Sequence, residues 1–301
     1  MPGSDSSLDP YLDALAARAL DDGGFAPDAE RRNPPRPDAT AWAILALEAA
    51  GVHEGPMASA RTWLTARQGR DGRVSLTPDQ PAAVWPTSLA ILAWQGSATH
   101  AEAQQRGVKL LLRLRGLTFP KTELLGHDTT LVGWPWIELT HSWVEPTAFG
   151  VMALDVTGND SHPRAREARE LLLDRQLEGG GWNYGNTTAF GQVQRPTPDS
   201  TGVALGALAS APAESAEAVE PSLLYLEREV ARLRAPLSLA WALLGLSAWS
   251  RRPDSAARWC RECLERQSAL GDYDTALLAV VLLAAHAPTG LVGCLRGSQT
   301  G

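Results

Sequence analysis

The chain has 301 residues, a net charge of −7 and 44% hydrophobic residues, which is ordinary for a globular protein with ample material for a core. Acidic and basic residues are mixed along the sequence, so no nucleic-acid partner is predicted. Three cysteines are an odd number, which argues against a disulfide framework and favours a reducing compartment. We therefore predict a cytoplasmic protein.

Neither a secretory signal nor a membrane span is predicted. Residues 1–10 are polar and acidic, without a basic segment followed by an apolar one. The longest apolar stretches, 276–285 and 238–249, fall short of the ~20 residues that cross a bilayer. Peripheral contact with a membrane stays open, and the oligomeric state is not predicted.

A ten-residue apolar pattern recurs six times along the chain. The copies begin at Asp38, Trp85, Glu145, Asp199, Leu237 and Asp274. Because each copy is apolar nearly all round, each predicts a helix that is buried on every side. A small residue occupies the sixth position of every copy, which we expect to let neighbouring helices approach closely.

Two polar columns mark the start of the copies. The first position is acidic in four of them, and the third position is threonine in four. Acidic residues, threonine and proline before an apolar run are signals of a helix N-terminus, because their side-chain oxygens accept hydrogen bonds from free backbone N–H groups. We therefore predict that Asp38, Glu145, Asp199 and Asp274 cap their helices.

Amphipathic stretches separate the apolar copies. They cover residues 8–20, 56–67, 101–115, 163–175, 216–234 and 254–266. This alternation predicts an all-α fold, an α6/α6 toroid (α/α barrel) of six helix pairs in which amphipathic outer helices ring buried inner ones. An open solenoid also fits the period, but six units favour closure. The predicted toroid covers residues 1–290 as one domain, and 291–301 are predicted to form a C-terminal tail.

A motif at the junction of outer and inner helices suggests a family. Gln176–Trp182 reads Q-x-x-x-G-x-W, and partial copies occur at Gln267–Tyr273, at Gln68–Val74 and at Gly23–Phe25. The pattern resembles the QW repeat of squalene–hopene and oxidosqualene cyclases, over about residues 22–286, and is similar to the barrel of protein prenyltransferase β-subunits. The resemblance implies a divergent single-barrel member of this terpenoid cyclase and prenyltransferase group, with structural roles for the Gln and aromatic residues.

The catalytic motifs of that family are incomplete here. The cyclases carry D-x-D-D-T, whose middle Asp protonates an alkene or epoxide. The matching windows 36–40 and 197–201 read R-P-D-A-T and T-P-D-S-T, so each keeps one Asp, Asp38 or Asp199, and the Thr. The prenyltransferases bind zinc through Asp, Cys and His, and no D-x-C occurs here. We predict no metal and no cofactor.

Four long loops are expected to meet at one mouth of the barrel: 21–37, 68–84, 116–144 and 176–198. Such loops on a rigid scaffold usually carry function. The candidate substrate-binding residues near this mouth are Trp85, Trp134, Trp136, Trp143, Trp182, Tyr184 and Arg195. The candidate catalytic residues are Asp199, Glu145, His141 and Asp38. Tryptophan faces stabilise cations, and an acid kept protonated by burial starts such a reaction. In the competing interpretation the tryptophans plug the mouth and Glu145 only caps its helix.

Three functions follow from these patterns. The main prediction is an isoprenoid-processing enzyme that binds an apolar or prenyl small molecule in the barrel and acts by acid or carbocation chemistry. The alternatives are a non-catalytic barrel that binds a lipid or a partner, and a carbohydrate-active barrel with paired carboxylates. The cavity distinguishes them: a deep apolar chamber favours isoprenoids, an open polar groove with two facing carboxylates favours sugars, and a plugged barrel favours a scaffold.

Overall fold

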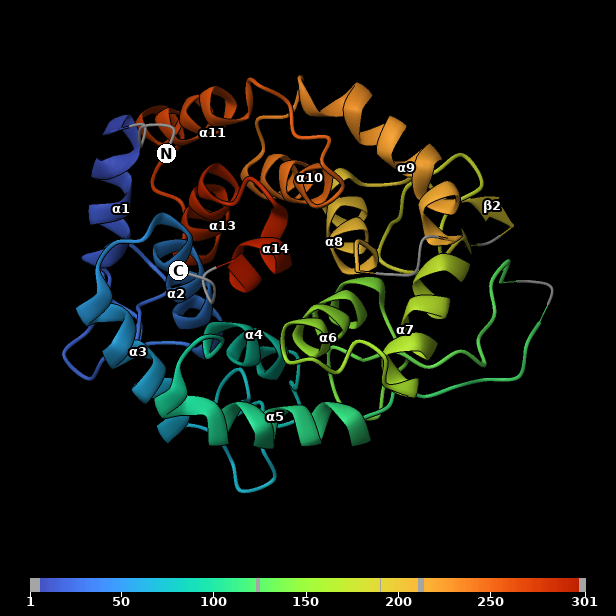
Figure 1. Cartoon of the computed structure of the whole chain (residues 1–301), viewed down its shortest axis with the longest axis horizontal. Helices are drawn as coiled ribbons and strands as arrows, with labels where there is room; N and C mark the ends of the chain where they lie inside the picture. Colours follow the sequence, from blue (N-terminus) through green and yellow to red (C-terminus); the bar gives the residue numbers. More distant parts are fainter. Residues whose placement is uncertain (1–5, 123–124, 190, 211–213, 298–301) are drawn as a thin grey trace.

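A computed structural model describes residues 6–122, 125–189, 191–210 and 214–297, and within these the chain is an α/α toroid (Figure 1). The inner helices are α2 (Pro37–Ala50), α4 (Pro86–Ala93), α6 (Val144–Val156), α8 (Pro198–Leu208), α10 (Pro236–Ala248) and α13 (Thr275–His286). Each contacts the next, and α13 packs on α2, so the ring is closed. This confirms the predicted fold class.

The outer helices alternate with the inner ones along the chain. They are α1 (Asp9–Ala16), α3 (Glu54–Ala66), α5 (Ala101–Arg113), α7 (Pro163–Asp174), α9 (Glu214–Val230) and α11 (Ala256–Glu265). Short elements complete the described chain: the 3-10 helices η1 (Ser6–Leu8) and η2 (Ala98–His100), α12 (Gln267–Leu270), and the antiparallel pair β1 (Thr188–Ala189) and β2 (Gln192–Val193). The outer helices expose their polar faces, so the apolar residues of both layers form one core.

Glycine permits a close contact between two inner helices. A Cβ placed on Gly202 of α8 would lie 2.0 Å from the backbone oxygen of Trp241 in α10, and one on Gly245 would lie 2.8 Å from the Cα of Gly202. Neither glycine belongs to the small-residue column. The column member Gly150 instead makes room for the ring of Trp134, whose Cε3 would lie 2.6 Å from an added Cβ. The two glycines at the contact between α8 and α10 therefore lie outside the column, although the Cβ on Gly202 would also lie 2.9 Å from the backbone nitrogen of the column member Ala242.

The threonine column joins loops to helices. Thr201 Oγ1 accepts a hydrogen bond of 2.9 Å from the backbone N–H of Trp182 and donates one to its backbone oxygen. Thr147 and Thr87 make the same pair of contacts with Trp134 and Val74. The sequence predicted that these threonines would bond to the first backbone N–H groups of their helices. Instead, each holds the loop that precedes its helix.

The acidic column was also misassigned as helix caps. Only Asp274 caps its helix, accepting a hydrogen bond of 2.7 Å from the backbone N–H of Leu277. Asp38, Glu145 and Asp199 lie one residue inside the first turn and make no capping bond, because their helices begin at Pro37, Val144 and Pro198. This position leaves the three carboxylates free for other contacts.

Residues of the Q-x-x-x-G-x-W segment connect neighbouring outer helices. Gln176 Nε2 donates to the backbone oxygen of Ala218 and to the hydroxyl of Ser222 in α9. The Trp182 side chain is fully buried, and its Nε1 donates to the backbone oxygen of Leu172 in α7. In this chain, Gln176 and Trp182 therefore hold the loop after α7 against the outer layer.

A further helix, α14 (Gly290–Gly297), packs against α6, α8, α10 and α13. It lies inside the ring in Figure 1 and buries Leu291, Val292 and Leu295. Arg296 donates a hydrogen bond of 2.7 Å to the backbone oxygen of Asp155, at the C-terminal end of α6. Most of the segment predicted as a tail is thus packed helix, and 298–301 lie outside the described residues.

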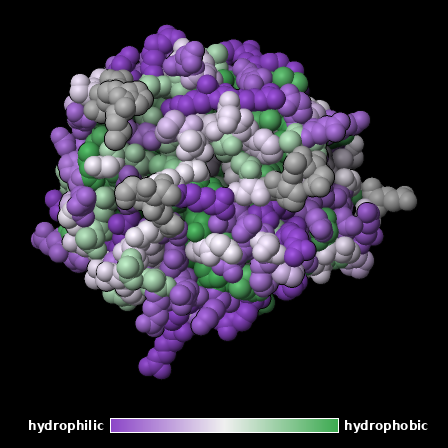
Figure 2. Space-filling model, viewed as in Figure 1, coloured by the Kyte–Doolittle hydropathy of each residue, from purple (hydrophilic) through white to green (hydrophobic). Residues whose placement is uncertain are grey.

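The face shown in Figure 2 differs in hydropathy between its rim and its middle. On the face shown in Figure 2, polar residues predominate around the rim, and apolar or weakly polar residues are more frequent towards the middle. Among the described residues no single helix is long and apolar enough to cross a membrane. The helices α13 and α14, which meet at a bend of 69°, together reach the length and apolar composition of a membrane span.

Candidate functional site

The long connections of the chain gather at the N-terminal ends of the inner helices. They are the segments 17–36, 67–85, 114–143 and 175–197, each running from an outer to an inner helix. The connection from α2 to α3 covers only 51–53, and that from α6 to α7 covers 157–162. One end of the barrel is therefore built from long loops, as predicted, and we call it the mouth.

A cavity of about 190 Å³ lies inside the ring near this mouth, and we call it the central cavity. Two columns of the repeat line most of it. The first-position residues are Trp85, Glu145, Asp199 and Leu237, and the fifth-position residues are Trp42, Phe149, Val203 and Trp241. Residues four apart share one helix face, which is why these two columns point into the same space.

Three aromatic rings pack together in the central cavity. The ring centroids of Trp42, Phe149 and Trp241 lie 5.7–5.9 Å apart in tilted and edge-to-face arrangements. Each side chain is at least nine-tenths buried. We call these residues the aromatic triad. Because three different helices contribute its rings, the triad joins opposite sides of the ring and narrows the interior of the barrel.

Two mouth tryptophans complete the aromatic wall. Trp85, directly before α4, and Trp136, in the loop 114–143, meet edge to face with centroids 5.4 Å apart. The backbone N–H of Val84 donates to the oxygen of Trp136, and that of Glu138 donates to the oxygen of Ala82. These bonds fix the loop 114–143 against the loop 67–85.

Glu145 and Asp199 are the two carboxylates of the central cavity. Ser200 Oγ donates a hydrogen bond of 3.1 Å to Glu145 Oε1, and Ser238 Oγ donates one of 3.4 Å to Asp199 Oδ1. Burial, and after it the negative charge of Asp199, raise the pKa of Glu145 to about 7 against the lowering effect of the Ser200 hydrogen bond. A carboxyl with this pKa is protonated in a large fraction of molecules near neutral pH.

The remaining candidate acid, Asp38, lies outside the central cavity. It is 4% exposed and forms an ion pair with Arg36, whose Nε donates to Asp38 Oδ1 at 2.9 Å. Both oxygens of this carboxylate are therefore occupied by one guanidinium. The structure therefore separates Asp38 from Glu145 and Asp199.

Two of the predicted substrate-binding tryptophans, Trp134 and Trp182, are instead buried against outer helices. Trp134 is 2% exposed, and its Nε1 donates to the backbone oxygen of Leu111, while Arg164 lies 4.4 Å from its ring centroid. Trp182 has no exposed surface. Neither side chain lines the central cavity; Trp134 hydrogen-bonds to α5 and Trp182 to α7.

His141 and Trp143 belong to a separate hollow. Their ring centroids lie 4.4 Å apart, and both line a pocket of about 260 Å³ between the loop 114–143 and the end of α7, which we call the side pocket. Tyr184 is 56% exposed, and Arg195 is also exposed. Neither lines the central cavity or the side pocket.

The sequence-based prediction missed the aromatic triad. Trp42, Phe149 and Trp241 occupy the fifth column, one helical turn after the first-column acids, so the signal was present as aromatic residues in three of six copies. The sixth copy was misaligned, which obscured this column. Asp274 lies outside α13, and the residue that lines the central cavity is Leu277 rather than Leu278. That copy begins one residue earlier than the alignment indicated.

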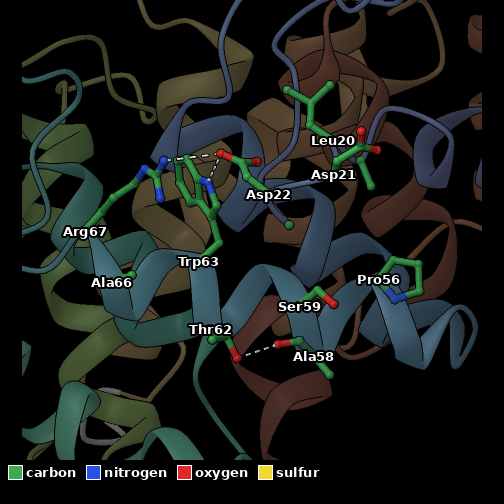
Figure 3. Close-up of a pocket in the computed structure, with 12 residues that line it drawn as sticks. Leu20, Asp21, Asp22, Pro56, Ala58, Ser59, Thr62, Trp63, Ala66 and Arg67 are labelled. Atoms are coloured by element: carbon green, nitrogen blue, oxygen red, sulfur yellow. Dashed lines mark hydrogen bonds and ion pairs between the residues drawn. The ribbon is translucent and has the colours of Figure 1, made fainter.

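A hollow of about 700 Å³ lies on the outside, between α3 and the loop 19–23 (Figure 3). Trp63 Nε1 donates a hydrogen bond of 2.8 Å to Asp22 Oδ2, and the Arg67 guanidinium lies 3.5 Å from the Trp63 ring centroid. Arg67 also pairs with Asp22. These three side chains satisfy one another, which makes this hollow a structural junction.

A groove of about 970 Å³ runs between the mouth loops 21–37 and 68–84. It contains Arg36 and Arg73, two cations that could in principle hold a diphosphate. Each is already engaged, Arg36 by Asp38 and Arg73 by Glu138 at 2.8 Å. A diphosphate at this groove would have to displace both ion pairs.

Comparison with known proteins places the fold. No protein-family description and no curated protein matches the chain. An alpha-1,6-mannanase from a Salegentibacter species aligns over 93% of this chain and 98% of its own, at 12% identity and a TM-score of 0.65. A type II terpene cyclase from Scytonema, in complex with its product merosterolic acid A, aligns over 96% and 83%, at 14% identity and a TM-score of 0.53.

A second terpenoid enzyme shares the fold. The ent-copalyl diphosphate synthase from Streptomyces platensis aligns over 87% of this chain and 50% of its own, at 18% identity and a TM-score of 0.53. Similarities at such low identity establish the α/α toroid and not a reaction, because one fold hosts many functions.

Proposed function

We propose that this chain is an enzyme that binds the end of an apolar, isoprenoid-type chain in the central cavity and protonates it with Glu145. The observation that carries the proposal is the lining of that cavity. Aromatic and aliphatic side chains make up all of it except Glu145 and Asp199. A protonated carboxyl surrounded by aromatic faces is the arrangement that generates and stabilises a carbocation.

The volume of the cavity limits what enters it. A dry protein cavity of about 150 Å³ holds one benzene molecule, so about 190 Å³ accommodates one isoprene unit. A whole triterpene does not fit beside the aromatic triad. We therefore propose short prenyl compounds as substrates, or longer ones of which only the end enters.

The proposed reaction begins with proton transfer from Glu145 to an alkene carbon or epoxide oxygen of the substrate. The π electrons of an alkene form the new C–H bond, which leaves the positive charge on the other alkene carbon. With an epoxide, an oxygen lone pair forms the new O–H bond and one ring C–O bond then breaks, which leaves the positive charge on that carbon. In both cases Glu145 is left as the carboxylate. The rings of Trp42, Trp85 and Phe149 stabilise the resulting positive charge through their faces. Loss of a proton from a neighbouring carbon to Glu145 or Asp199 then forms a new double bond and neutralises the cation.

Product analysis by gas chromatography and mass spectrometry tests this proposal. The protein is incubated with geranyl, farnesyl and geranylgeranyl diphosphates, squalene and oxidosqualene, in H₂O and in D₂O. We expect a product from a short substrate that carries one deuterium in D₂O, because the carboxyl proton exchanges with solvent. Glu145→Gln should abolish it and Asp199→Asn should reduce it.

Glu138→Gln is the matched control for this experiment. Glu138 lies in the same mouth loop as Trp136 but pairs with Arg73 outside the central cavity, so its replacement should leave product formation intact. Equal loss of product in both glutamate variants would contradict the assignment to Glu145. No product from any substrate, with a lipid co-purifying in the barrel, would favour a binding protein instead.

A carbohydrate-active enzyme is the second candidate. Two carboxylates in one cavity, one of them with a raised pKa, is the arrangement of acid and base in glycoside hydrolysis, and the mannanase shares this fold. The apolar lining weighs against it, because sugar hydroxyls buried there would lack hydrogen-bond partners. Release of mannose from alpha-1,6-mannotriose, lost in Glu145→Gln, would establish this candidate and exclude the isoprenoid one.

A further inference from the structure

The side pocket is built differently from the central cavity and shares no lining residue with it. Its walls come from two stretches of the loop 114–143, the end of α7 and the loop after Trp182. Leu117 and Phe119 form an apolar part and are 45% and 51% exposed. Arg175 and two histidines, His127 and His141, form the polar part. The pocket therefore has one apolar side and one cationic side.

Arg175 is the buried charge of the side pocket. Its residue is 5% exposed, although it lies at the end of an outer helix. Nη1 donates to the backbone oxygen of Asp128 at 3.2 Å and to Asp174 Oδ2 at 2.6 Å. Asp174 in turn accepts hydrogen bonds from the backbone N–H of Asp128. These contacts fix the guanidinium in place.

The guanidinium has donor capacity beyond these bonds. An arginine presents five N–H donors in a planar fork. Within the described part of the chain, the hydrogen bonds of Arg175 come from Nη1, which leaves Nε and Nη2 to meet a ligand. Two parallel N–H donors of this kind match the two oxygens of a carboxylate.

The two histidines supply neutral hydrogen-bonding groups beside this cation. Burial lowers the pKa of His127 and of His141, and the charge of Arg175 lowers both further. His127 Nδ1 lies 3.3 Å from the hydroxyl of Thr187, and the His141 ring packs on Trp143. Each imidazole can donate or accept one hydrogen bond at the pocket. The positive charge at the pocket is that of Arg175, which pairs with Asp174 through Nη1 and keeps Nε and Nη2 for a ligand.

We infer that the side pocket binds a small monocarboxylate with an apolar body, the carboxylate on Arg175 and the body against Leu117 and Phe119. The pocket of about 260 Å³ exceeds the ~150 Å³ that holds a benzene ring, so an aryl or short alkyl acid has a suitable size. This site is independent of the proposed function, because it uses neither Glu145 nor Asp199.

Calorimetric titration with phenylacetate tests the inference. We expect saturable one-to-one binding in the millimolar range or tighter, with phenylacetamide at least about tenfold weaker because it lacks the charge. Acetate should also bind at least about tenfold more weakly, since it lacks the apolar body. Equal binding of acid and amide, or no binding of phenylacetate at millimolar concentration, would overturn the inference.

Histidine-selective NMR locates the ligand without relying on affinity. The chain has six histidines, so few ring signals are present, and His141→Gln and His127→Gln assign two of them. Phenylacetate should move those two signals and leave the rest in place. Shifts confined to other histidines would place the ligand elsewhere and overturn the inference.

Two variants separate binding from folding. Arg175→Met removes the guanidinium and should weaken phenylacetate binding at least about tenfold, with circular dichroism reporting whether the helices persist. Phe119→Ala alters a half-exposed side chain, so it should leave the fold intact while weakening phenylacetate more than acetate. Unchanged binding in a folded Phe119→Ala protein would contradict the assigned orientation.

Discussion

Ser200 of α8 donates a hydrogen bond of 3.1 Å to Glu145 of the neighbouring inner helix α6. Ser200 occupies the position at which the cyclase motif D-x-D-D-T carries an acid, so a hydroxyl replaces a carboxylate beside Asp199. A neutral donor there lowers the pKa of Glu145 only in part, and burial keeps it at about 7. The acid of this site is therefore Glu145 on the neighbouring helix, by our proposal.

Replacing Glu145 with glutamine should stabilise the protein at neutral and alkaline pH. Its folded-state pKa of about 7 exceeds the ordinary value of 4.5, so this group's contribution is fully present below pH 4.5 and is lost as pH rises through 7. Above that range the unfolding free energy of the variant should exceed that of the wild type by on the order of 3 kcal/mol. Urea unfolding at pH 5 and pH 8 measures this, and an unchanged difference between the two pH values would contradict it.

Removing one threonine hydroxyl should detach a mouth loop. In Thr201→Val the backbone N–H of the buried Trp182 loses its acceptor, which should cost about 1–3 kcal/mol of unfolding free energy. Thr118→Val, at an exposed loop position, provides a control of the same shape change and should cost less than about 0.5 kcal/mol. Chemical denaturation compares them, and equal effects would argue against the role of the threonine column.

The contact between α8 and α10 should tolerate no side chain at Gly202. An added Cβ would lie 2.0 Å from the backbone oxygen of Trp241, so Gly202→Ala should destabilise by roughly 3 kcal/mol or more. Gly206→Ala lies on the same helix, where the nearest neighbour of an added Cβ, Met152 Sδ, is 3.7 Å away. That variant should gain up to about 1 kcal/mol from helix propensity. Thermal unfolding should therefore shift in opposite directions for the two.

Opening the aromatic triad should enlarge the central cavity. Trp42→Ala removes a ring that packs on both Phe149 and Trp241, at a cost of about 3–5 kcal/mol in stability. If the variant stays folded, xenon or benzene binding measured by NMR should increase, because a dry apolar cavity accepts such probes. No gain in probe binding would mean that the neighbouring helices collapse into the space.

The fold was predictable because burial imposes the same pattern six times. An inner helix such as α6 is apolar all round, whereas an outer helix such as α5 is not, and that contrast appears directly in the residues. The helix starts were less predictable. If a helix begins one residue earlier, Glu145 or Asp199 moves from the capping position into the first turn. Only the three-dimensional path of the preceding loop decides which of the two positions the acid occupies.

The candidate site was predicted in part for a related reason. Trp85, Trp136, Glu145 and Asp199 do line the central cavity, but Trp134 and Trp182 fill gaps behind the ring. A tryptophan that packs and a tryptophan that lines a cavity have the same local sequence signal. The distinction depends on which helix face each side chain reaches. The fifth column marks the face that lines the central cavity, but the copies can be aligned correctly only once the helix ends are known.

Infrared difference spectroscopy of the Glu145 carboxyl tests the central claim most directly. The wild-type spectrum minus that of Glu145→Gln, recorded from pH 4 to pH 9, isolates the carbonyl stretch of one protonated group. The account predicts a band that persists through pH 6 and titrates at about 7. A band that disappears near the ordinary glutamate value of 4.5 would mean that Glu145 is ionised at neutral pH and is not the proton donor.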